Sequence, residues 1–344
     1  MTGKVLISVD PGSADLFFRE VKESALARPL GRLDEWHHLC HLDEGFEALF
    51  WLHRFPVQVE WEWSGDTLES LLEQPWYDLD SGWLGERPFG IQVGSNQRWD
   101  WSFADLAQRL KEQLGLPEER FRPRLPERVL SVFLHRAGGR TTVYAGISST
   151  GENLSAWASG QCRIPRDEAS VSRAEAKLQE AYEAFLLPSL PTGGQALDLG
   201  AAPGGWTRVL AQKGFRVDAV DPADLDPRVL ALDGVKHHRE TAGSFLGQRK
   251  SAHYDLMVSD MKMDAAMAAS LLVRHANCLK REGGLLLSTL KLGKGPVAYD
   301  QAREALQRLG ERYQVLAARQ LYFNRSEITV LARPLAKRER SRKG

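Results

Sequence analysis

Four ionisable residues occupy places from which their side chains could do acid–base chemistry. They are Lys177 in a helical stretch, Asp260 at the end of YDLMVSD, Lys291 near the end of LLLSTLKL, and Glu327 within RSEITVLAR. Lysine and carboxylate side chains can act as acids, bases or positioning groups, if the fold brings them together. Considered singly, Lys177 is typical of a solvated helix surface, and Glu327 fits the solvent face of a strand equally well.

A glycine-rich loop follows a short apolar run at residues 195–210, QALDLGAAPGGWTRVL. It lacks the G-x-G-x-x-G spacing of a dinucleotide site, and Trp206 and Thr207 stand where a phosphate-binding P-loop has Lys and Ser. Asp198 ends the preceding strand, where a carboxylate facing the ligand disfavours a polyphosphate and favours a cationic group. Asp221 ends the next strand, where a carboxylate can bind the ribose hydroxyls of an adenosine. S-adenosylmethionine suits both positions, whereas the plainer alternative is a tight strand-to-helix turn.

The elements that would position these residues begin near residue 170. The stretch SVSRAEAKLQEAYEAFLL predicts a helix, after which apolar runs alternate with amphipathic stretches. The predicted strands cover 196–200, 216–222, 235–240, 254–260, 283–292, 313–322 and 326–334, and the predicted helices cover 205–214, 265–280 and 298–310. This alternation indicates an α/β fold with a mainly parallel sheet. Since ligands bind at the carboxyl ends of such strands, we expect Asp260 and Lys291 to point toward the ligand of the loop.

The first 165 residues have a different pattern, which predicts an α+β region. Extended runs at 4–12, 55–63, 87–95, 128–136 and 140–149 are combined with helical stretches at 13–27 and 102–115. Seven of the ten tryptophans lie between residues 51 and 101. Exposed indole rings could stack on nucleic-acid bases, but the same stretch is strongly acidic. We therefore expect most of these tryptophans to be core or domain-contact residues.

The charge of the chain is unevenly distributed although its net value is zero. Residues 1–170 carry 18 Lys and Arg against 26 Asp and Glu, a difference of −8, which leaves 27 against 19, or +8, for residues 171–344. Any affinity for nucleic acid is therefore expected mostly in the second half. The length of 344 residues predicts more than one domain.

Cysteines and the N-terminal sequence bear on the compartment. Cys40, Cys162 and Cys278 are far apart and form no C-x-x-C pair, so we expect buried thiols in a reducing environment. The N-terminus resembles no leader and no run is long enough to span a membrane, which predicts a soluble, cytoplasmic protein. No metal site is expected, because the His-His pairs at 37–38 and 237–238 are adjacent residues that do not readily share one ion.

Five motifs together resemble the FtsJ-like ribose 2'-O-methyltransferases. They are SRAEAKL, DLGAAPGGW, VSDM, TLKL and RQLYFNRSEITV, which span residues 172–330. The Lys-Asp-Lys-Glu tetrad of that family falls on Lys177, Asp260, Lys291 and Glu327. The resemblance implies a Rossmann-like class I methyltransferase domain at 169–335. In front of it, an N-terminal α+β module would occupy 1–75 and a THUMP-like RNA-binding module 76–168, and a basic tail would follow at 336–344.

The resemblance also implies S-adenosylmethionine as the cofactor. The residues predicted to bind it are Ser172, Asp198, Gly200, Ala202, Pro203, Gly204, Gly205, Trp206, Asp221, Thr241 and Asp260. One position departs from the family pattern, because RETAG has Thr241 where an acidic residue is usual on the adenine side. Either Glu240 or a backbone amide would then have to make that contact.

The activity implied by the resemblance is methylation of the ribose 2'-hydroxyl of a cytidine in large-subunit (23S) ribosomal RNA. Lys291 would be the base, with Lys177, Asp260 and Glu327 orienting it and the ribose; alternatively, Lys291 stays charged and only positions the hydroxyl. Other hypotheses are another RNA substrate and a non-catalytic RNA-binding factor of ribosome assembly. Methylation of a base is disfavoured, because VSDM at 258–261 is not the N/D-P-P-[YF] motif that holds an amine. DNA is not an expected partner, and the sequence does not identify the methylated nucleotide or the oligomeric state.

Overall fold

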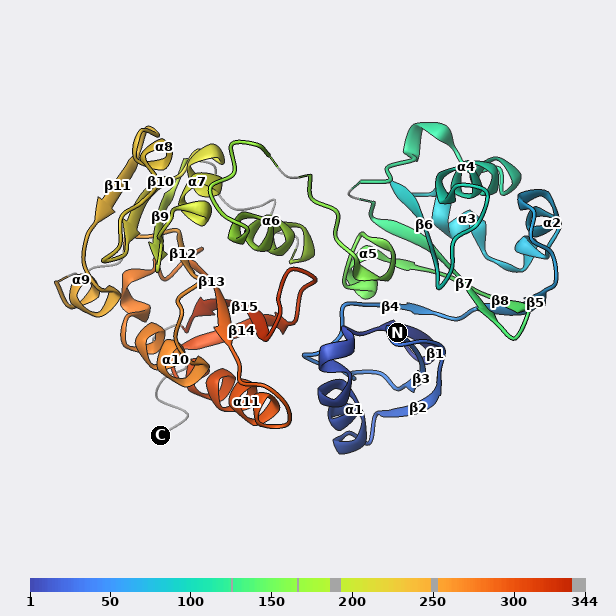
Figure 1. The fold of residues 1–344 in the computed structure, drawn as a ribbon, viewed down its shortest axis with the longest axis horizontal. Coiled ribbons are helices and arrows are strands. Elements are labelled where there is room, and N and C mark those ends of the chain that lie inside the picture. The colour runs from blue at the N-terminus through green and yellow to red at the C-terminus, as the bar shows by residue number, and fades with distance from the viewer. Residues whose placement is uncertain (125, 166, 186–192, 249–252, 336–344) are drawn as a thin grey trace. The chain divides into compact units, whose positions relative to one another are not determined.

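A computed structural model describes residues 1–344 except 125, 166, 186–192, 249–252 and 336–344. Contacts within the chain divide it into two compact units, Met1–Arg163 and Ile164–Gly344 (Figure 1). The predicted basic tail at 336–344 lies outside the described residues.

The first unit contains two four-stranded sheets, as expected for an α+β region. One sheet has the order β2-β3-β1-β4 and the other the order β5-β8-β7-β6. The strands are β1 (Gly3–Ser8), β2 (Ala27–Arg32), β3 (His37–Leu42), β4 (His53–Pro56), β5 (Val59–Trp63), β6 (Phe89–Ser95), β7 (Arg128–Ala137) and β8 (Arg140–Ser149). The helices are α1 (Ala14–Glu23), α2 (Leu68–Leu72), α3 (Ser81–Gly85), α4 (Phe103–Gln113) and α5 (Thr150–Asn153). The second sheet therefore draws strands from both sides of residue 75, and the THUMP-like character of this region remains a prediction.

Two details of the first unit differ from the sequence prediction. The run predicted as one strand at 55–63 forms β4 and β5, which belong to different sheets. Pro56 ends β4, since proline lacks the N–H that would continue a strand ladder. The predicted helix at 13–27 ends at Glu23, because Ala27 already belongs to strand β2.

The tryptophan-rich stretch forms the core of the first unit, which confirms the prediction. Trp51, Trp63 and Trp76 are at most 3% exposed. Trp61, Trp99 and Trp101 pack partly buried against the same core as Trp63 and Trp76, and only Trp83 of the seven has a substantially exposed side chain. The three cysteines are buried free thiols, also as predicted.

The second unit contains a seven-stranded, mainly parallel sheet of order β11-β10-β9-β12-β13-β15-β14, which confirms the predicted fold class. Its strands are β9 (Gln195–Leu199), β10 (Arg216–Val220), β11 (Val235–His238), β12 (Leu256–Ser259), β13 (Leu285–Lys291), β14 (Tyr313–Arg319) and β15 (Glu327–Pro334). Strands β9 to β13 pair in parallel, whereas β15 runs antiparallel to both β13 and β14. The predicted strands match these elements closely.

Helices cover both faces of this sheet, with α6 and α7 on one side and α10 and α11 on the other (Figure 1). The helices are α6 (Ala174–Ala184), α7 (Gly205–Gln212), α8 (Pro227–Leu230), α9 (Ala242–Gln248), α10 (Ala265–Arg274) and α11 (Val297–Leu309). Leu178 of α6 and Leu210 of α7 are fully buried in one apolar cluster with Val258 and Leu287 of the sheet. Burial of such side chains stabilises each helix on the sheet by roughly 1.5–3 kcal/mol per residue.

One edge of the sheet gathers the chemistry-bearing residues. The carboxyl ends of β9, β10, β12 and β13 meet there because these strands are parallel. Strand β10 ends one residue before Asp221, β12 one residue before Asp260, and β13 on Lys291. Strand β15 runs the other way, so its first residue, Glu327, starts at this edge and pairs directly with Lys291.

Candidate active site

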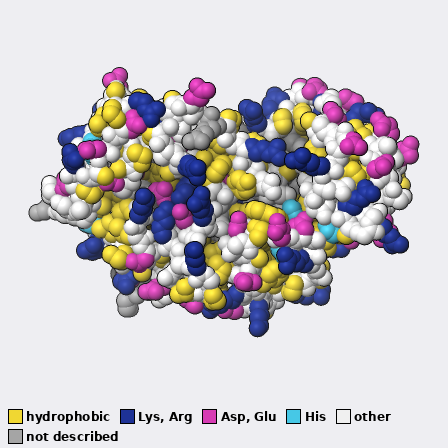
Figure 2. All heavy atoms as spheres, viewed as in Figure 1, with side chains coloured by type: hydrophobic (Ala, Val, Ile, Leu, Met, Phe, Trp, Pro, Cys, Tyr) yellow, Lys and Arg dark blue, Asp and Glu magenta, His cyan; other side chains and the backbone are white. Residues whose placement is uncertain are grey.

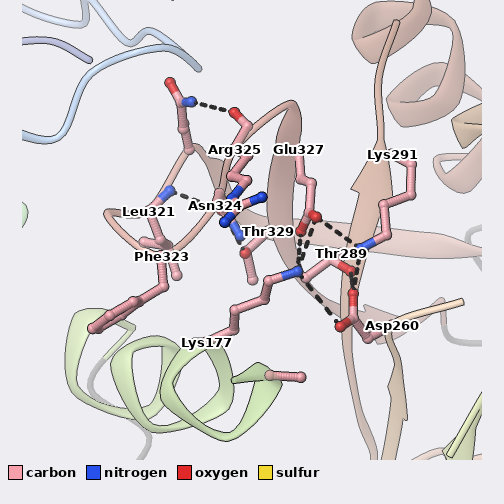
Figure 3. Close-up of polar contacts among 12 residues, drawn as sticks. Lys177, Asp260, Thr289, Lys291, Leu321, Phe323, Asn324, Arg325, Glu327 and Thr329 are labelled. Atoms are coloured by element: carbon pink, nitrogen blue, oxygen red, sulfur yellow. Dashed lines mark hydrogen bonds and ion pairs between the residues drawn. The ribbon is translucent and has the colours of Figure 1, made fainter. Parts of the chain in front are cut away.

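The four predicted catalytic residues form one ionic cluster at this edge (Figure 3). Lys177 Nζ lies 2.8 Å from Glu327 Oε1 and 2.7 Å from Glu327 Oε2, and 3.5 Å from Asp260 Oδ2. Lys291 Nζ donates to Asp260 Oδ1 at 2.6 Å and to Glu327 Oε1 at 2.8 Å. Each ammonium thus contacts both carboxylates. We refer to Lys177, Asp260, Lys291 and Glu327 as the tetrad.

Two members of the tetrad could also have been solvent-facing residues, Lys177 on a helix surface and Glu327 on a strand, but both are mostly buried. The side chain of Lys177 is 16% exposed and that of Glu327 is 11% exposed. Lys291, the most accessible of the four, is 25% exposed. Partial burial strengthens the ion pairs while leaving one ammonium within reach of solvent and of a substrate.

Charge balance in the tetrad sets the protonation of Lys291. Burial lowers the pKa of this lysine, but the carboxylates of Asp260 and Glu327 more than offset it, so the pKa lies above the ordinary value. Lys291 is therefore an ammonium ion in the protein alone. A further positive charge nearby or the loss of a carboxylate would lower this pKa and ease removal of the proton during a reaction.

Thr289 belongs to the site although the sequence analysis did not identify it. Its hydroxyl donates a short hydrogen bond to Asp260, on the same carboxylate oxygen that Lys291 contacts. Thr289 and Lys291 are two residues apart on β13 and therefore project from the same face of the sheet. This alternation is the signal by which the sequence could have revealed Thr289.

The glycine loop between β9 and α7 brings its backbone close to neighbouring side chains. Gly200 has φ +80°, and a Cβ there would lie 2.8 Å from Met261 Cγ; Gly204 has φ +112°, and a Cβ there would lie 2.9 Å from Val229 Cγ1. Both positions therefore require glycine, for backbone conformation as well as for space. Pro203 follows a cis peptide bond and accepts a backbone hydrogen bond from Asp226 at 2.9 Å.

Asp221 lies beside this loop, at the end of β10. Its Oδ2 accepts the N–H of Ala202 at 3.1 Å, and its Oδ1 accepts the N–H of Ala223 at 2.8 Å. Each carboxylate oxygen has a second lone pair, so Asp221 can hold the loop and still accept hydrogen bonds from a ligand.

The expectation that Asp198 faces the ligand is wrong. Its side chain is only 1% exposed and accepts a hydrogen bond from the Thr207 hydroxyl at 2.6 Å, in the first turn of α7. Burial, together with the charges of Asp260 and Asp221, raises the pKa of Asp198 to about 7 against the opposing effect of hydrogen bonds from Thr207. Asp198 therefore ties β9 to α7 from inside the protein.

Ser172 and Trp206 lie where α6 meets α7. A Cβ at Gly205 would come within 2.1 Å of Ser172 Oγ, so the residues preceding α6 pack directly on the start of α7. The Trp206 ring is 3% exposed and donates from Nε1 to the Ala174 carbonyl at 2.7 Å, so only its backbone can face a ligand of the loop.

Thr241 and Glu240, the residues predicted to lie on the adenine side, both make local contacts around α9. The Thr241 hydroxyl accepts the N–H of Ser244 at 3.2 Å and so caps the first turn of α9. Glu240 Oε2 accepts a hydrogen bond from Gln248 at 3.1 Å. Both Glu240 and a backbone amide therefore stay as predictions for the adenine contact.

Basic side chains gather over α6 and β15 on the face of the second unit drawn in Figure 2. Arg325, just before β15, is exposed. Within the described part of the chain, no group of three or more His, Cys, Asp and Glu has an arrangement that would hold a metal ion. No helix among the described residues is both long and apolar enough to cross a membrane.

Comparison with known proteins places this site in a family. Residues 170–327 match the model of the FtsJ-like methyltransferase family. The ribosomal RNA large subunit methyltransferase M of Halorhodospira halophila is 34% identical over 187 residues, which are 54% of this chain and 53% of that protein. The protein of the same name from Alkalilimnicola ehrlichii is 36% identical over 242 residues, which are 65% of each chain. The chain thus spans about half the length of the first of these relatives.

A comparison of structures adds little to these matches. The crystal structure of TrmN from Thermus thermophilus covers 96% of this chain and 99% of its own, at 14% identity and a TM-score of 0.39. A score this low does not establish a common fold. The family match, the mixed seven-stranded sheet and the tetrad agree with one another, however: residues 170–327 match the FtsJ-like methyltransferase family model and have a Rossmann-like methyltransferase fold.

Proposed function

We propose that this chain is an S-adenosylmethionine-dependent RNA 2'-O-ribose methyltransferase, with a cytidine of large-subunit (23S) ribosomal RNA as its substrate. The observation that carries the proposal is the tetrad, in which both ammonium groups contact both carboxylates at the edge of the sheet that holds the glycine loop. The names of the relatives support ribosomal RNA as the substrate class. The cytoplasm is the location that fits this substrate.

The loop and its neighbours fit S-adenosylmethionine. Gly200 and Gly204 keep the loop backbone free of side chains, and Asp221 offers acceptor lone pairs for ribose hydroxyls. The proposed binding residues are the loop from Gly200 to Trp206, together with Ser172, Asp221, Thr241 and Asp260, while Asp198 supports the loop from beneath. When bound, this cofactor supplies a methyl group that its sulfonium has already activated.

The tetrad would orient the ribose and remove the proton of its 2'-hydroxyl. Lys291 Nζ is the proposed acceptor, because it is the most accessible nitrogen of the cluster. Asp260 and Glu327 fix the position of Nζ through hydrogen bonds of 2.6 and 2.8 Å. Lys177 compensates the charge of both carboxylates, so that they do not hold the Lys291 proton with their full strength.

Methylation of protein-free large-subunit ribosomal RNA tests the proposal. The purified chain is incubated with the RNA and isotopically labelled S-adenosylmethionine, and nucleosides are analysed by mass spectrometry. We expect label in 2'-O-methylcytidine. Label in a base would contradict ribose methylation, and RNA binding without any label would indicate a non-catalytic factor.

The Gly204→Ala variant tests the loop as the cofactor site. A methyl group there would meet Val229 at 2.9 Å, and φ +112° is unfavourable for alanine by roughly 1–2 kcal/mol. We expect the loop to shift and the affinity for S-adenosylmethionine, measured by calorimetry, to fall at least about tenfold, which corresponds to about 1.4 kcal/mol.

Gly247→Ala in α9 is the matched control, because a Cβ there has no neighbour within 4 Å and alanine favours a helix. Its affinity should equal that of the wild type. Unchanged affinity in Gly204→Ala would show that the cofactor does not depend on this loop.

A further inference from the structure

Helix α6 holds the segment 322–327 at both of its ends. One end is Glu327, which pairs with Lys177. At the other end, the Glu180 carboxylate accepts the backbone N–H of Tyr322 at 2.7 Å and that of Phe323 at 2.8 Å. Lys177 and Glu180 are three residues apart and therefore lie on the same side of α6. The helix that supplies one tetrad residue thus also positions the loop that leads to another.

Buried side chains hold the same loop from the sheet side (Figure 3). Asn324, 4% exposed, accepts the N–H of Leu321 at 2.8 Å and the hydroxyl of Thr329 at 2.9 Å. Gln320, 1% exposed, donates to the Arg325 carbonyl at 2.8 Å. These hydrogen bonds satisfy backbone groups of the loop and stabilise the conformation that it has here.

The side chain that this loop presents is aromatic. Tyr322 is 36% exposed. The other Phe, Trp and Tyr residues described in the unit Ile164–Gly344 are buried or partly buried. Its ring contacts that of Phe323 edge to face, at 5.4 Å between centroids. Arg325, two residues before Glu327, is also exposed. A tyrosine face and a cation exposed on one short loop suit an unstacked base and its phosphate.

We propose that the loop Gln320–Arg325 is a preformed platform on which Tyr322 stacks an unpaired nucleobase of the substrate RNA, and that Glu180 is the positioning residue that holds this platform against the tetrad. The inference rests on the proposed function. The platform recognises no particular base, because every base offers a stacking face. Its role is to bring single-stranded RNA to Lys291 in a fixed orientation.

Steady-state kinetics of Tyr322→Ala on RNA tests the platform. Stacking on an aromatic side chain is worth roughly 1–3 kcal/mol, so we expect KM for RNA to rise at least about fivefold, with an unchanged dissociation constant for S-adenosylmethionine. Tyr322→Phe keeps the ring and should keep KM. Leu316→Ala is the matched control, since Leu316 is 43% exposed on β14 and offers no aromatic face.

Glu180→Gln tests the positioning role by a different readout. The amide keeps one acceptor oxygen for two backbone N–H groups, so the loop should loosen and Glu327 should be held less well. We expect kcat to fall about fivefold or more, since lost positioning acts on the chemical step, while cofactor affinity stays close to wild type. The unfolding temperature is measured beside kcat, because a buried N–H that loses its acceptor lowers stability.

The outcomes separate this inference from the function on which it rests. If the wild type methylates RNA but Tyr322→Ala keeps its KM, the platform is wrong. If Glu180→Gln keeps its kcat, the positioning role is wrong. If the wild type transfers no methyl group to any RNA, the proposed function itself fails, and the platform then fails with it.

Discussion

The Lys291→Met variant is expected to lose methyl transfer to RNA by roughly 10²–10⁴-fold, the usual contribution of a positioned acid–base group. Lys291 Nζ is the accessible nitrogen of the tetrad, and methionine replaces it by an apolar group of similar length. Single-turnover methylation at saturating RNA and cofactor measures this loss. The affinity for S-adenosylmethionine is measured beside it, because Asp260 belongs to the proposed cofactor site and is a hydrogen-bond partner of Lys291.

Removing one cation also changes the charge balance of the tetrad, so stability must be measured beside activity. Asp260 and Glu327 would keep only Lys177 as a cationic partner within the tetrad, which favours some loss of stability in a partly buried cluster. Lys236→Met, at an exposed position of the edge strand β11, is the matched control and should keep full activity. A folded Lys291→Met protein with wild-type single-turnover rates would refute the catalytic role of Lys291.

Much of this site was predictable because parallel strands bring their carboxyl ends together. Asp260 and Lys291 lie at the ends of adjacent parallel strands, and Lys291 Nζ lies 2.6 Å from Asp260 Oδ1. Glu327 was harder to interpret, since a charge next to an apolar strand fits solvent equally well. Only the reversed direction of β15 brings its first residue beside Lys291, and strand direction cannot be read from the local pattern. The resemblance to a family supplied what periodicity did not.

The orientations of other side chains depend on hydrogen bonds between different secondary-structure elements. The orientation of Asp198 follows from the hydroxyl of Thr207 nine residues later, which draws the carboxylate into the protein. Glu180 reads as an ordinary helix carboxylate in the sequence, yet it is 6% exposed because it caps two N–H groups more than 140 residues away. Local patterns give positions on a helix or strand, whereas such pairings need the tertiary fold.

The rate of methyl transfer should rise with pH, about tenfold for each unit, as long as Lys291 is mostly protonated. Asp260 and Glu327 hold its pKa above the ordinary value for lysine, so the neutral amine is a small fraction at neutral pH and grows in proportion to hydroxide. The useful range begins at about pH 8, because the carboxyl groups of Asp198 and Glu180 both have a pKa of about 7 and titrate below it. Between about pH 8 and pH 10 the expected gain is therefore about a hundredfold.

The Glu327→Gln variant is expected to shift this pH profile to lower pH if Lys291 is the base. The variant removes one of the two carboxylates that raise the pKa of Lys291, so the pKa falls and the profile bends toward its plateau at a lower pH than in the wild type. Single-turnover rates under saturating conditions measure both profiles. A rate that is flat from about pH 8 upward would instead assign the ammonium form of Lys291 to positioning the hydroxyl, since a base must first lose its own proton.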